Sequence, residues 1–460
     1  MNVIINPHQF SGVVRIPASK SHTIRQLLIA SLANGVSEIN YPLDSLDARS
    51  CVSVCRAFGA EVTEYRAVDP AEENPNPAGG KGEKLVKWEV KGNSGFKQKG
   101  VTSNIMIDVG NSGTTLYLAL AAAGLQAESV EFTGDEQIQR RSAAPLLEAL
   151  SGLGVQCVSN NGCAPVTVKG PWKGGRVSLP CPTSQYLSAL LLASPLAPSG
   201  IVTEIDVPLL NERPYVEMTL SYLTAHGIPF KVCFSEDNKE SSSYFTVSGG
   251  YSWKAFSGSV PGDFSSAAFP AAAAVISGGQ VIILGLDPED TQGDKYFFDI
   301  LSQMGCDVKW EEKNEEGKAE YALTVSRKST LRGGTFDLNK TPDLLPAAAV
   351  VAAFAHGDTA LVNVAHARIK ETDRIAVMAE ELAKLGVNCT ERPDGLIIHG
   401  KGAPLLTPHS SLLTINGHGD HRIVMAFAAA ALGSPCPIEI TGAESAAVTY
   451  PGFLSLIKKP

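Results

Sequence analysis

The hydrophobic pattern of the chain is dominated by apolar segments rich in alanine and leucine, each of which follows a short polar turn and ends near a glycine. The six copies are SKSHTIRQLLIASLANG, GNSGTTLYLALAAAG, PTSQYLSALLLASPLAPSG, GDFSSAAFPAAAAVISG, TPDLLPAAAVVAAFAHG and GDHRIVMAFAAAALG. They recur about every 80 residues, a longer period than the ~20–50 residues of the common solenoids. Because a helix that is apolar nearly all round is buried, the pattern predicts six buried helices, arranged as two bundles of three and wrapped by sheets.

A second pattern lies between these segments, an amphipathic stretch followed by a glycine and an apolar run. It occurs as CRAFGAEV, LSGLGVQC, LTAHGIPF, LSQMGCDV and LAKLGVNC. Glycine suits the position after a helix C-terminus, where a positive φ is needed, and the apolar run predicts a strand. Alternating strands and helices predict an α/β protein. A sixth copy of this motif would fall just beyond Pro460. The first interval between copies is the longest, and its extra residues predict an extended, mobile loop from about Asp69 to Gly100.

The composition is that of a folded protein rather than of a disordered or membrane-spanning one. The 460 residues suggest two large domains or about three ordinary ones. With 44% hydrophobic and 18% charged residues the chain has ample apolar surface to bury, which excludes intrinsic disorder. No apolar run reaches the ~18 residues of a transmembrane helix. The first residues, MNVIINPHQF, have neither the basic nor the apolar region of a signal peptide.

Net charge and cysteine usage narrow the function classes further. The formal charge of −9 argues against general nucleic-acid binding, which depends on neutralising phosphates. Anionic ligands would need a local cluster of cations, because the net negative charge of the whole chain repels them. The nine cysteines show no CxxC spacing, so neither structural zinc nor a disulfide framework is expected, and a reducing cytoplasm fits.

Candidate chemistry gathers at the polar turns that precede helices, because helix N-termini carry unpaired N–H groups and attract anions. Cations occupy several of these turns, namely Lys20, Arg25, Arg141, Lys370, Arg374 and Arg422. Each feature alone is more often an ordinary cap or a solvated helix start, as Asp420 before Arg422 illustrates. Their combination across the repeats points to a site for anionic ligands.

The motifs PASKSHTIRQLLIA, GNSGT, PTSQYLSALLLASPLA, PGDFSSAAF, QGD, TPD, RIKETDRI and GDHRIVMA occur in the order seen in the 5-enolpyruvylshikimate-3-phosphate synthase family. The resemblance covers about residues 10–455, and its most specific parts are SKS-x3-R, KETDR and GDHR. It implies an inside-out α/β barrel with two domains, each of three βαβαββ repeats. By resemblance one domain comprises residues 1–18 and 261–460, the other comprises residues 19–260, and the active site lies in the cleft between them.

The family reaction transfers the enolpyruvyl (1-carboxyvinyl) group of phosphoenolpyruvate to the 5-hydroxyl of shikimate 3-phosphate and releases phosphate, in the shikimate pathway of aromatic amino acid biosynthesis. By resemblance the residues that hold shikimate 3-phosphate are Lys20, Ser21, Arg25, Thr183, Ser184, Gln185, Asp343, His366 and Lys370. Those around phosphoenolpyruvate are Lys20, Gly113, Arg141, Gln185, Arg374 and Arg422. Arginine suits this role because its planar guanidinium meets carboxylate and phosphate oxygens bidentately.

The chemistry needs two proton movements, since the 5-hydroxyl loses a proton as it attacks C2 and the methylene carbon gains one. The resemblance implies that Asp343 is the base and Glu371 the acid, with Lys20 assisting the transfers. No metal or organic cofactor is expected, because positioning and electrostatics supply the catalysis. We expect a cytoplasmic monomer that acts on small molecules and binds neither nucleic acid nor a membrane.

The sequence departs from the family pattern at several site positions. These are Tyr117-Leu118 in place of Arg-Pro, Gln137 in place of arginine, Thr183 and Glu212 in place of serines, and Val448 in place of lysine. Glu212 would put a carboxylate near the substrate phosphate unless it turns away or pairs with Arg213. These changes leave two alternatives open: a changed acceptor, or a degenerate paralogue that binds phosphorylated ligands without turnover.

Two related families are less consistent with the sequence. The transferase acting on UDP-N-acetylglucosamine opens with Ser-Gly-Ala-Lys-Asn and usually has a catalytic cysteine on a loop, whereas this chain has SKS-x3-R and no cysteine in that context. RNA 3′-phosphate cyclase has related repeats, but a charge of −9 argues against RNA binding.

Overall fold

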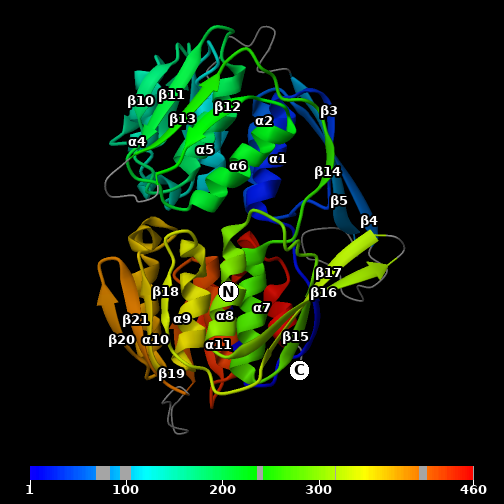
Figure 1. The fold of residues 1–460 in the computed structure, drawn as a ribbon, viewed down its shortest axis with the longest axis vertical. Helices are drawn as coiled ribbons and strands as arrows, with labels where there is room; N and C mark the ends of the chain where they lie inside the picture. Colours follow the sequence, from blue (N-terminus) through cyan, green and yellow to red (C-terminus); the bar gives the residue numbers. More distant parts are fainter. Residues whose placement is uncertain (69–82, 94–104, 236–241, 316–317, 403–411, 459–460) are drawn as a thin grey trace. The chain divides into compact units, whose positions relative to one another are not determined.

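The computed structural model describes residues 1–68, 83–93, 105–235, 242–315, 318–402 and 412–458. Within them the chain forms two compact units, which we call unit 1 (Met1–Pro17 and Pro261–Pro460) and unit 2 (Ala18–Val260). Each unit has its own hydrophobic core and, in its described part, three β-sheets. In each unit the apolar, alanine-rich helices lie inside and the sheets lie outside (Figure 1).

Unit 2 repeats one arrangement of strand, helix, strand, helix and antiparallel strand pair. One copy consists of β6 (Ile105–Asp108), α3 (Gly113–Ala123), β7 (Val130–Thr133), α4 (Ala144–Gly152), β8 (Gln156–Asn160) and β9 (Cys163–Lys169). The next consists of β10 (Gly175–Ser178), α5 (Gln185–Ala193), β11 (Val202–Val207), α6 (Arg213–Ala225), β12 (Phe230–Cys233) and β13 (Ser243–Ser248). Helix α3 carries the chain back between parallel strands β6 and β7, and β9 pairs antiparallel with both β7 and β8.

The remaining copy of unit 2 is assembled from two distant parts of the chain. Its consecutive part consists of α1 (Lys20–Leu32), β3 (Asn34–Asn40), α2 (Leu46–Ala57), β4 (Glu61–Val68) and β5 (Glu83–Asn93). The missing first strand is β14 (Ser257–Ser259), which lies parallel to β3 at the other end of the unit's sequence. The sheet therefore has the same strand pattern as its two neighbours, with the order β14-β3-β5-β4.

Unit 1 follows the same plan, with a first strand supplied from the chain start. Its first copy consists of β2 (Gly12–Arg15), α7 (Phe264–Ser277), β15 (Gln280–Leu284), α8 (Tyr296–Gln303), β16 (Cys306–Glu315) and β17 (Lys318–Arg327). The second consists of β18 (Thr335–Asp337), α9 (Leu345–Ala353), β19 (His356–Val362), α10 (Arg374–Lys384), β20 (Asn388–Arg392) and β21 (Gly395–Lys401). Strand β2 lies parallel to β15, so two segments far apart in sequence share one sheet.

The last copy of unit 1 ends differently from the others. It consists of β22 (Leu413–Asn416), α11 (His421–Leu432), β23 (Ile438–Thr441) and α12 (Phe453–Lys458). The sequence pattern placed its sixth glycine motif beyond Pro460, and the structure shows what replaces the corresponding strands. Strand β1 (Asn2–Ile5) pairs antiparallel with β23 and completes a three-stranded sheet.

Six short 3-10 helices connect these elements in the described residues. They are η1 (Ile138–Arg140), η2 (Ser194–Leu196), η3 (Gly293–Lys295), η4 (Pro342–Leu344), η5 (Ala365–Ile369) and η6 (Ala443–Val448). Three of them involve candidate site residues: η4 contains Asp343, η5 contains His366 and ends directly before Lys370, and η1 ends directly before Arg141.

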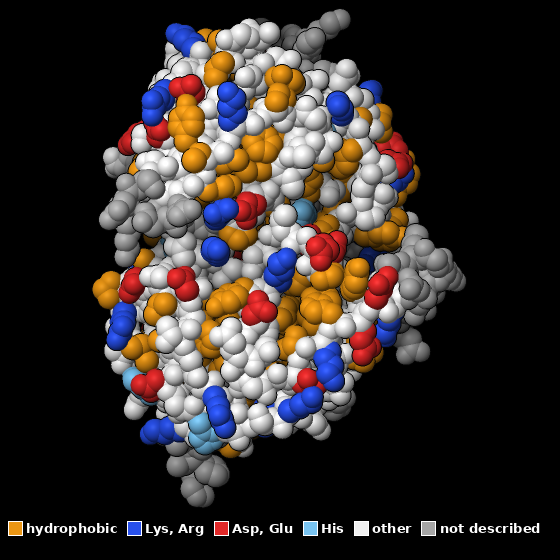
Figure 2. All heavy atoms as spheres, viewed as in Figure 1, with side chains coloured by type: hydrophobic (Ala, Val, Ile, Leu, Met, Phe, Trp, Pro, Cys, Tyr) orange, Lys and Arg blue, Asp and Glu red, His pale blue; other side chains and the backbone are white. Residues whose placement is uncertain are grey.

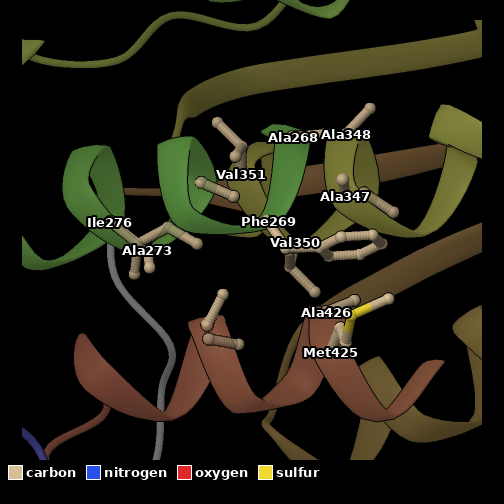
Figure 3. Packing of buried hydrophobic residues seen from close by; sticks show 14 of the residues in the cluster. Ala268, Phe269, Ala273, Ile276, Ala347, Ala348, Val350, Val351, Met425 and Ala426 are labelled. Atoms are coloured by element: carbon tan, nitrogen blue, oxygen red, sulfur yellow. The ribbon is translucent and has the colours of Figure 1, made fainter. Parts of the chain in front are cut away.

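The apolar helices form the cores, which confirms the prediction of buried helices. In unit 1, α7, α9 and α11 pack against one another, and every residue of α9 is buried. Figure 3 shows Ala268, Ala347 and Ala426 among the side chains that face this packing. Small alanine side chains let helix backbones approach closely, and larger residues such as Phe269 fill the remaining space (Figure 3).

Two expectations about local structure have different outcomes. The five glycines predicted to follow helices all have positive φ, between 71° and 100°: Gly59, Gly154, Gly227, Gly305 and Gly386. The predicted loop from Asp69 to Gly100 is wrong over Glu83–Asn93, which form β5. Trp88 and Val90 of this strand are fully buried. The surrounding polar residues hid the alternation of buried and exposed positions that is typical of a strand. The rest of that predicted loop lies outside the described residues.

The surface in view is mixed in charge. Lysine and arginine side chains are interspersed with acidic ones over the face shown in Figure 2. The net charge of −9 is therefore not gathered into one acidic area on this face. Among the described helices, none has the length and apolar character needed to cross a membrane.

Candidate active site

The candidate residues of unit 1 meet at the starts of three helices. Asp343 lies in η4 directly before α9, Arg374 is the first residue of α10, and Arg422 is the second residue of α11. They belong to a connected set of ion pairs, which we call the ion-pair cluster: Asp343, Lys370, Glu371, Arg374, Asp420 and Arg422. The cluster lies entirely within unit 1.

Arg374 is the centre of the ion-pair cluster, and its side chain is 0% exposed. Its Nε lies 2.8 Å from Oδ2 of Asp420, and its Nη1 lies 2.7 Å from Oδ1 of Asp343. Its Nη2 donates to Oε2 of Glu371 at 2.5 Å. Burial alone lowers the pKa of this guanidinium, but the three carboxylates outweigh burial and raise the pKa above its ordinary value. Arg374 is thus a permanently charged residue held by three acidic partners.

Asp343 receives positive charge from three sides. Its Oδ2 lies 3.0 Å from Nη2 of Arg422, and its Oδ1 lies 3.9 Å from Nζ of Lys370, in addition to the contact with Arg374. Burial raises the pKa of the Asp343 carboxyl, but these cations hold it well below its usual range. The carboxylate is therefore ionised and accepts a proton weakly while the surrounding cations keep their full effect.

Asp420 and Arg422 join the start of α11 to the ion-pair cluster. Asp420 is the N-cap of α11 and accepts a hydrogen bond from the backbone N–H of Arg422 at 2.9 Å. Arg422 donates from Nη2 to Oγ of Ser265 at 2.7 Å, and its Nη1 lies 2.6 Å from Nε2 of His421. Among the described residues, the buried Nε of Arg422 has no hydrogen-bond partner. A ligand oxygen is the kind of group that would satisfy it.

The charges of the ion-pair cluster balance. Three cations face three carboxylates, so the formal charge of the set is zero. The sequence indicated a cationic site for anions, and the structure adds that each of these cations is paired with an acidic side chain. An anionic ligand must compete with the carboxylates for the guanidinium and ammonium groups.

His366, a further candidate, is buried in η5 four positions before Lys370.

In unit 2 the start of α5 forms a second group of candidate residues. Oε2 of Glu212 accepts three hydrogen bonds, from the hydroxyl of Thr183 at 3.1 Å, the hydroxyl of Ser184 at 2.8 Å and the backbone N–H of Ser184 at 2.9 Å. We call Thr183, Ser184 and Glu212 the hydroxyl cluster. All three residues are buried. The neighbouring Gln185 has a buried Oε1 without a partner among the described residues.

Glu212 follows neither of the two exceptions that the sequence analysis allowed. It does not turn away from the candidate phosphate position, because it bonds Thr183 and Ser184. It is not neutralised by Arg213, whose Nε instead donates to Oε1 of Glu217 at 2.8 Å. The hydroxyl and N–H donors expected to hold a substrate phosphate are therefore occupied by a protein carboxylate.

Arg25 lies beside the hydroxyl cluster and is almost completely buried, with 1% exposure. Its Nε donates to Oγ1 of Thr219 at 3.0 Å, and its Nη2 donates to Oγ of Ser188 at 3.2 Å. Its Nη1 donates to the carbonyl of Ser21 at 3.1 Å. Burial lowers the pKa of Arg25 to about 10, although Glu212 and nearby tyrosines oppose the shift. The side chain is thus charged at neutral pH and joins α1 to α5 and α6.

Lys20 and Arg141 mark two other helix starts of unit 2. Nζ of Lys20, the first residue of α1, lies 3.0 Å from Oδ2 of the buried Asp47. Arg141 follows η1 and lies against the start of α3, since a Cβ added to Gly113 would stand 2.5 Å from its Nη1. Glycine at position 113 therefore makes room for the guanidinium. The preceding Arg140 is exposed and pairs with Glu136, so only the second arginine of the pair faces a candidate site.

The departure at Tyr117 has a structural role in the same region. The hydroxyls of Tyr117 and Tyr186 both donate to the carbonyl of Ser142, at 3.3 Å and 2.5 Å. The two rings pack edge to face with centroids 5.0 Å apart. Because Ser142 is the residue after Arg141, this tyrosine pair fixes the backbone beside the guanidinium.

Sequence reasoning missed several residues that complete the two groups. Asp420 was read as a plain N-cap, but it also holds Arg374. Ser265 and Asp47 were not singled out, although they contact Arg422 and Lys20. Ser265 and Asp420 stand inside the quoted motifs PGDFSSAAF and GDHR, so a local signal existed for them. Asp47 lies in no quoted motif, and only the packing of α2 on α1 brings it to Lys20.

One further group of the described residues has the composition of a metal site: Glu380, Glu381 and His418. Both oxygens of Glu381 accept hydrogen bonds from Nζ of Lys384, at 2.7 Å and 2.8 Å. His418 adds a contact of 2.7 Å to the same carboxylate. The ammonium group occupies the place of a cation, so this group is an ion pair between the buried Glu381 and the partly exposed Lys384.

Comparisons with known proteins agree along nearly the whole chain. A family model described as EPSP synthase (3-phosphoshikimate 1-carboxyvinyltransferase) matches residues 4–457. A 3-phosphoshikimate 1-carboxyvinyltransferase from Acetivibrio thermocellus is 44% identical over 454 residues, which cover 98% of this chain and 96% of that protein. One from Methanothermobacter thermautotrophicus is 38% identical over 445 residues, 96% of this chain and 94% of that protein.

Solved structures show the same relationship in three dimensions. An EPSP synthase from Acinetobacter baumannii superimposes with a TM-score of 0.75 at 29% identity, over 99% of this chain and 97% of that one. The fold and the comparisons define an α/β transferase enzyme built from repeated units, which confirms the predicted fold class. The chain belongs to the EPSP synthase family.

Proposed function

We propose that this chain carries out its family's reaction, the transfer of the 1-carboxyvinyl group from phosphoenolpyruvate to the 5-hydroxyl of shikimate 3-phosphate with release of phosphate. The observation that carries the proposal is the ion-pair cluster. It joins a carboxylate, Asp343, that can accept a proton once substrate anions offset the surrounding cations, to buried guanidinium groups suited to anionic substrates. Residues of both units serve this one reaction in the proposal, as the family resemblance implies.

The phosphoenolpyruvate side of the proposal rests on arginine. Arg422 has a buried Nε that no described residue satisfies, and Arg141 lies against the N-terminus of α3. A guanidinium at a helix N-terminus adds its charge to that of the helix dipole, and both favour a carboxylate or a phosphate. Lys20, Gln185 and Arg374 complete this group by resemblance, although Arg374 is already held by carboxylates.

The proposed site for shikimate 3-phosphate contains both positively and negatively charged side chains. Ser21, Arg25, Thr183, Ser184, Gln185, His366 and Lys370 hold shikimate 3-phosphate in the proposal. Asp343 accepts the proton of the attacking 5-hydroxyl, and Glu371, an ionised carboxylate in the cluster, first takes up a proton and then delivers it to the methylene carbon, with Lys20 assisting. These transfers need no group outside the chain, because acids, bases and charges are all supplied by side chains.

The charge balance of the ion-pair cluster suggests how the base becomes active. Without substrate, three cations keep the pKa of Asp343 well below its usual range, which makes the carboxylate a weak base. Anionic substrates that bind Arg422 or Lys370 offset part of that positive charge. The pKa of Asp343 then rises towards its ordinary value, so substrate binding and base strength increase together.

The test is phosphate release from phosphoenolpyruvate, followed with and without shikimate 3-phosphate. Release that depends on shikimate 3-phosphate supports the proposal. No release at saturating concentrations of both substrates would instead favour a protein that binds phosphorylated ligands without turnover.

We further propose that the enzyme works as a monomer in the cytoplasm, where its nine free cysteines would stay reduced.

A further inference from the structure

The carboxylate of Glu212 occupies a position built for an anion. Oε2 accepts hydrogen bonds from two hydroxyls and one backbone N–H, all from the residues that lead into α5. Helix α5 is nine residues long. The N-terminus of such a helix favours negative charge. The positive charge of the buried Arg25 acts on the same carboxylate. Donors, helix and cation together make the environment in which a phosphate group is usually bound.

The backbone and the neighbours of Glu212 hold its side chain there. The residue has φ 56° and ψ 38°, a left-handed conformation that non-glycine residues seldom adopt. The residue is 3% exposed. The adjacent Arg213 is engaged elsewhere, by an ion pair with Glu217 and by stacking 3.9 Å above the Phe234 ring. The carboxylate is therefore placed by the fold on the hydroxyls of Thr183 and Ser184.

We propose that Glu212 is a specificity-determining residue that competes with the phosphate of the acceptor for the donors of Thr183 and Ser184. The inference rests on the proposed function, in which these donors hold shikimate 3-phosphate. The phosphate takes the donors only when the carboxylate leaves them, because two anions cannot share three donors without strong repulsion. Binding of the acceptor is therefore coupled to a displacement of Glu212.

This competition has a specific consequence for recognition. A phosphate that must displace an internal carboxylate adds less to affinity than one that meets empty donors. The enzyme should thus discriminate weakly between shikimate 3-phosphate and shikimate, which differ only in the phosphate. The useful quantity is the ratio of the dissociation constant of shikimate to that of shikimate 3-phosphate, since contacts shared by the two ligands cancel in it.

The experiment measures this ratio by isothermal titration calorimetry in the full-length wild-type protein and in two variants. Glu212→Ser removes the carboxylate, and Glu212→Gln keeps the shape and an acceptor oxygen but removes the charge. We expect the ratio to rise about ten- to hundredfold in Glu212→Ser, the effect of one charge-assisted contact, and by a smaller factor in Glu212→Gln. The matched control is Glu217→Gln, which removes a half-exposed carboxylate from the same helix and should leave the ratio unchanged.

A structural role alone would give a different pattern. If Glu212 only stabilises the junction of α5 and α6, both variants lower the melting temperature while the ratio stays unchanged or falls, and the inference is wrong. Should Glu212→Ser fail to fold, the near-isosteric Glu212→Gln decides the question by the same criterion. In an active enzyme, the KM for shikimate 3-phosphate should fall in both variants while the KM for phosphoenolpyruvate changes less than about twofold.

The inference and the proposed function fail separately. Phosphate release by the wild-type protein tests the reaction, whereas the calorimetric ratio tests the competition and needs no turnover. Turnover with an unchanged ratio in the variants would overturn only the role of Glu212. A raised ratio without turnover in the wild-type protein would overturn only the proposed reaction.

Discussion

The ion-pair cluster of unit 1 and the hydroxyl cluster of unit 2 both hold protein carboxylates in places suited to anionic ligands, but they do so with different partners. In the ion-pair cluster, charged guanidinium and ammonium groups face carboxylates, and the formal charges cancel. In the hydroxyl cluster, one carboxylate is held by neutral hydroxyl and N–H groups. The first arrangement favours chemistry and stability, whereas the second favours recognition.

This difference follows from electrostatics. Buried opposite charges stabilise one another, and removal of one partner leaves an uncompensated charge. Neutral donors can exchange one anion for another at a smaller free-energy difference, because either anion satisfies the same hydroxyl and N–H groups. We therefore expect substitutions of the carboxylates in the ion-pair cluster to affect kcat and folding, and those at the helix starts of unit 2 to affect binding.

The largest effect should come from Asp343. Asp343→Ala should lower kcat by about 10²–10⁴-fold, the usual contribution of a general base, while phosphoenolpyruvate affinity changes much less. Steady-state kinetics together with equilibrium binding of phosphoenolpyruvate separates the two quantities. Asp343→Asn is the matched variant, because it keeps a hydrogen-bonding oxygen beside Arg374 and Arg422 but removes the basic group. A near-normal kcat in either variant would show that another residue is the base.

The next effect concerns the stability of unit 1. Asp420→Ala removes both the N-cap of α11 and a partner of the fully buried Arg374. Breaking a buried pair in this way typically destabilises a protein by about 3–5 kcal/mol, and chemical denaturation would measure the loss. The control is Asp206→Ala, which breaks the pair with the exposed Arg176 and should change the free energy of unfolding far less than Asp420→Ala does. Equal losses in the two variants would contradict the view that burial makes Asp420 important.

The fold was largely predictable because its signals are periodic. Alanine-rich helices at a constant spacing predicted buried helices, and the glycines after the amphipathic helices have the positive φ that was expected. Strand β5 was missed, since charged residues separate its buried Trp88 and Val90. The pairing of β14 with β3, and of β1 with β23, could not be read from local pattern, because these strands are joined only by the tertiary fold.

The sequence predicted which residues form the candidate site, but it did not predict which ion pairs and hydrogen bonds they make. Helix starts and motifs indicated Arg374 and Asp343, yet nothing in the sequence showed that Arg374 would bind three carboxylates at once. The position of Glu212 is a similar case. Its departure from the family pattern was visible, but whether its carboxylate met Arg213 or Ser184 depended on side-chain packing.

A binding effect is expected at the start of α3. Gly113→Ala would place a methyl group 2.5 Å from Nη1 of Arg141, so the guanidinium must move. Loss of one charge-assisted contact corresponds to about a ten- to hundredfold higher KM for phosphoenolpyruvate, with a smaller change in kcat. Gly258→Ala is the control, since the nearest atom to its added Cβ is 3.8 Å away. A large loss of kcat at unchanged KM would contradict a binding role for the start of α3.

The smallest effect should come from Val448, which the family resemblance places where a lysine would contact phosphoenolpyruvate. Val448 ends η6, which packs against α11, the helix that carries Arg422. By the family resemblance, a lysine introduced at this position would offer phosphoenolpyruvate one more cation. Val448→Lys should therefore lower the KM for phosphoenolpyruvate by up to about tenfold, because the added cation has no carboxylate assigned to it. Val448→Met adds comparable length without charge and should leave KM unchanged. An equal gain in both variants would mean that packing, and not charge, limits phosphoenolpyruvate binding in unit 1.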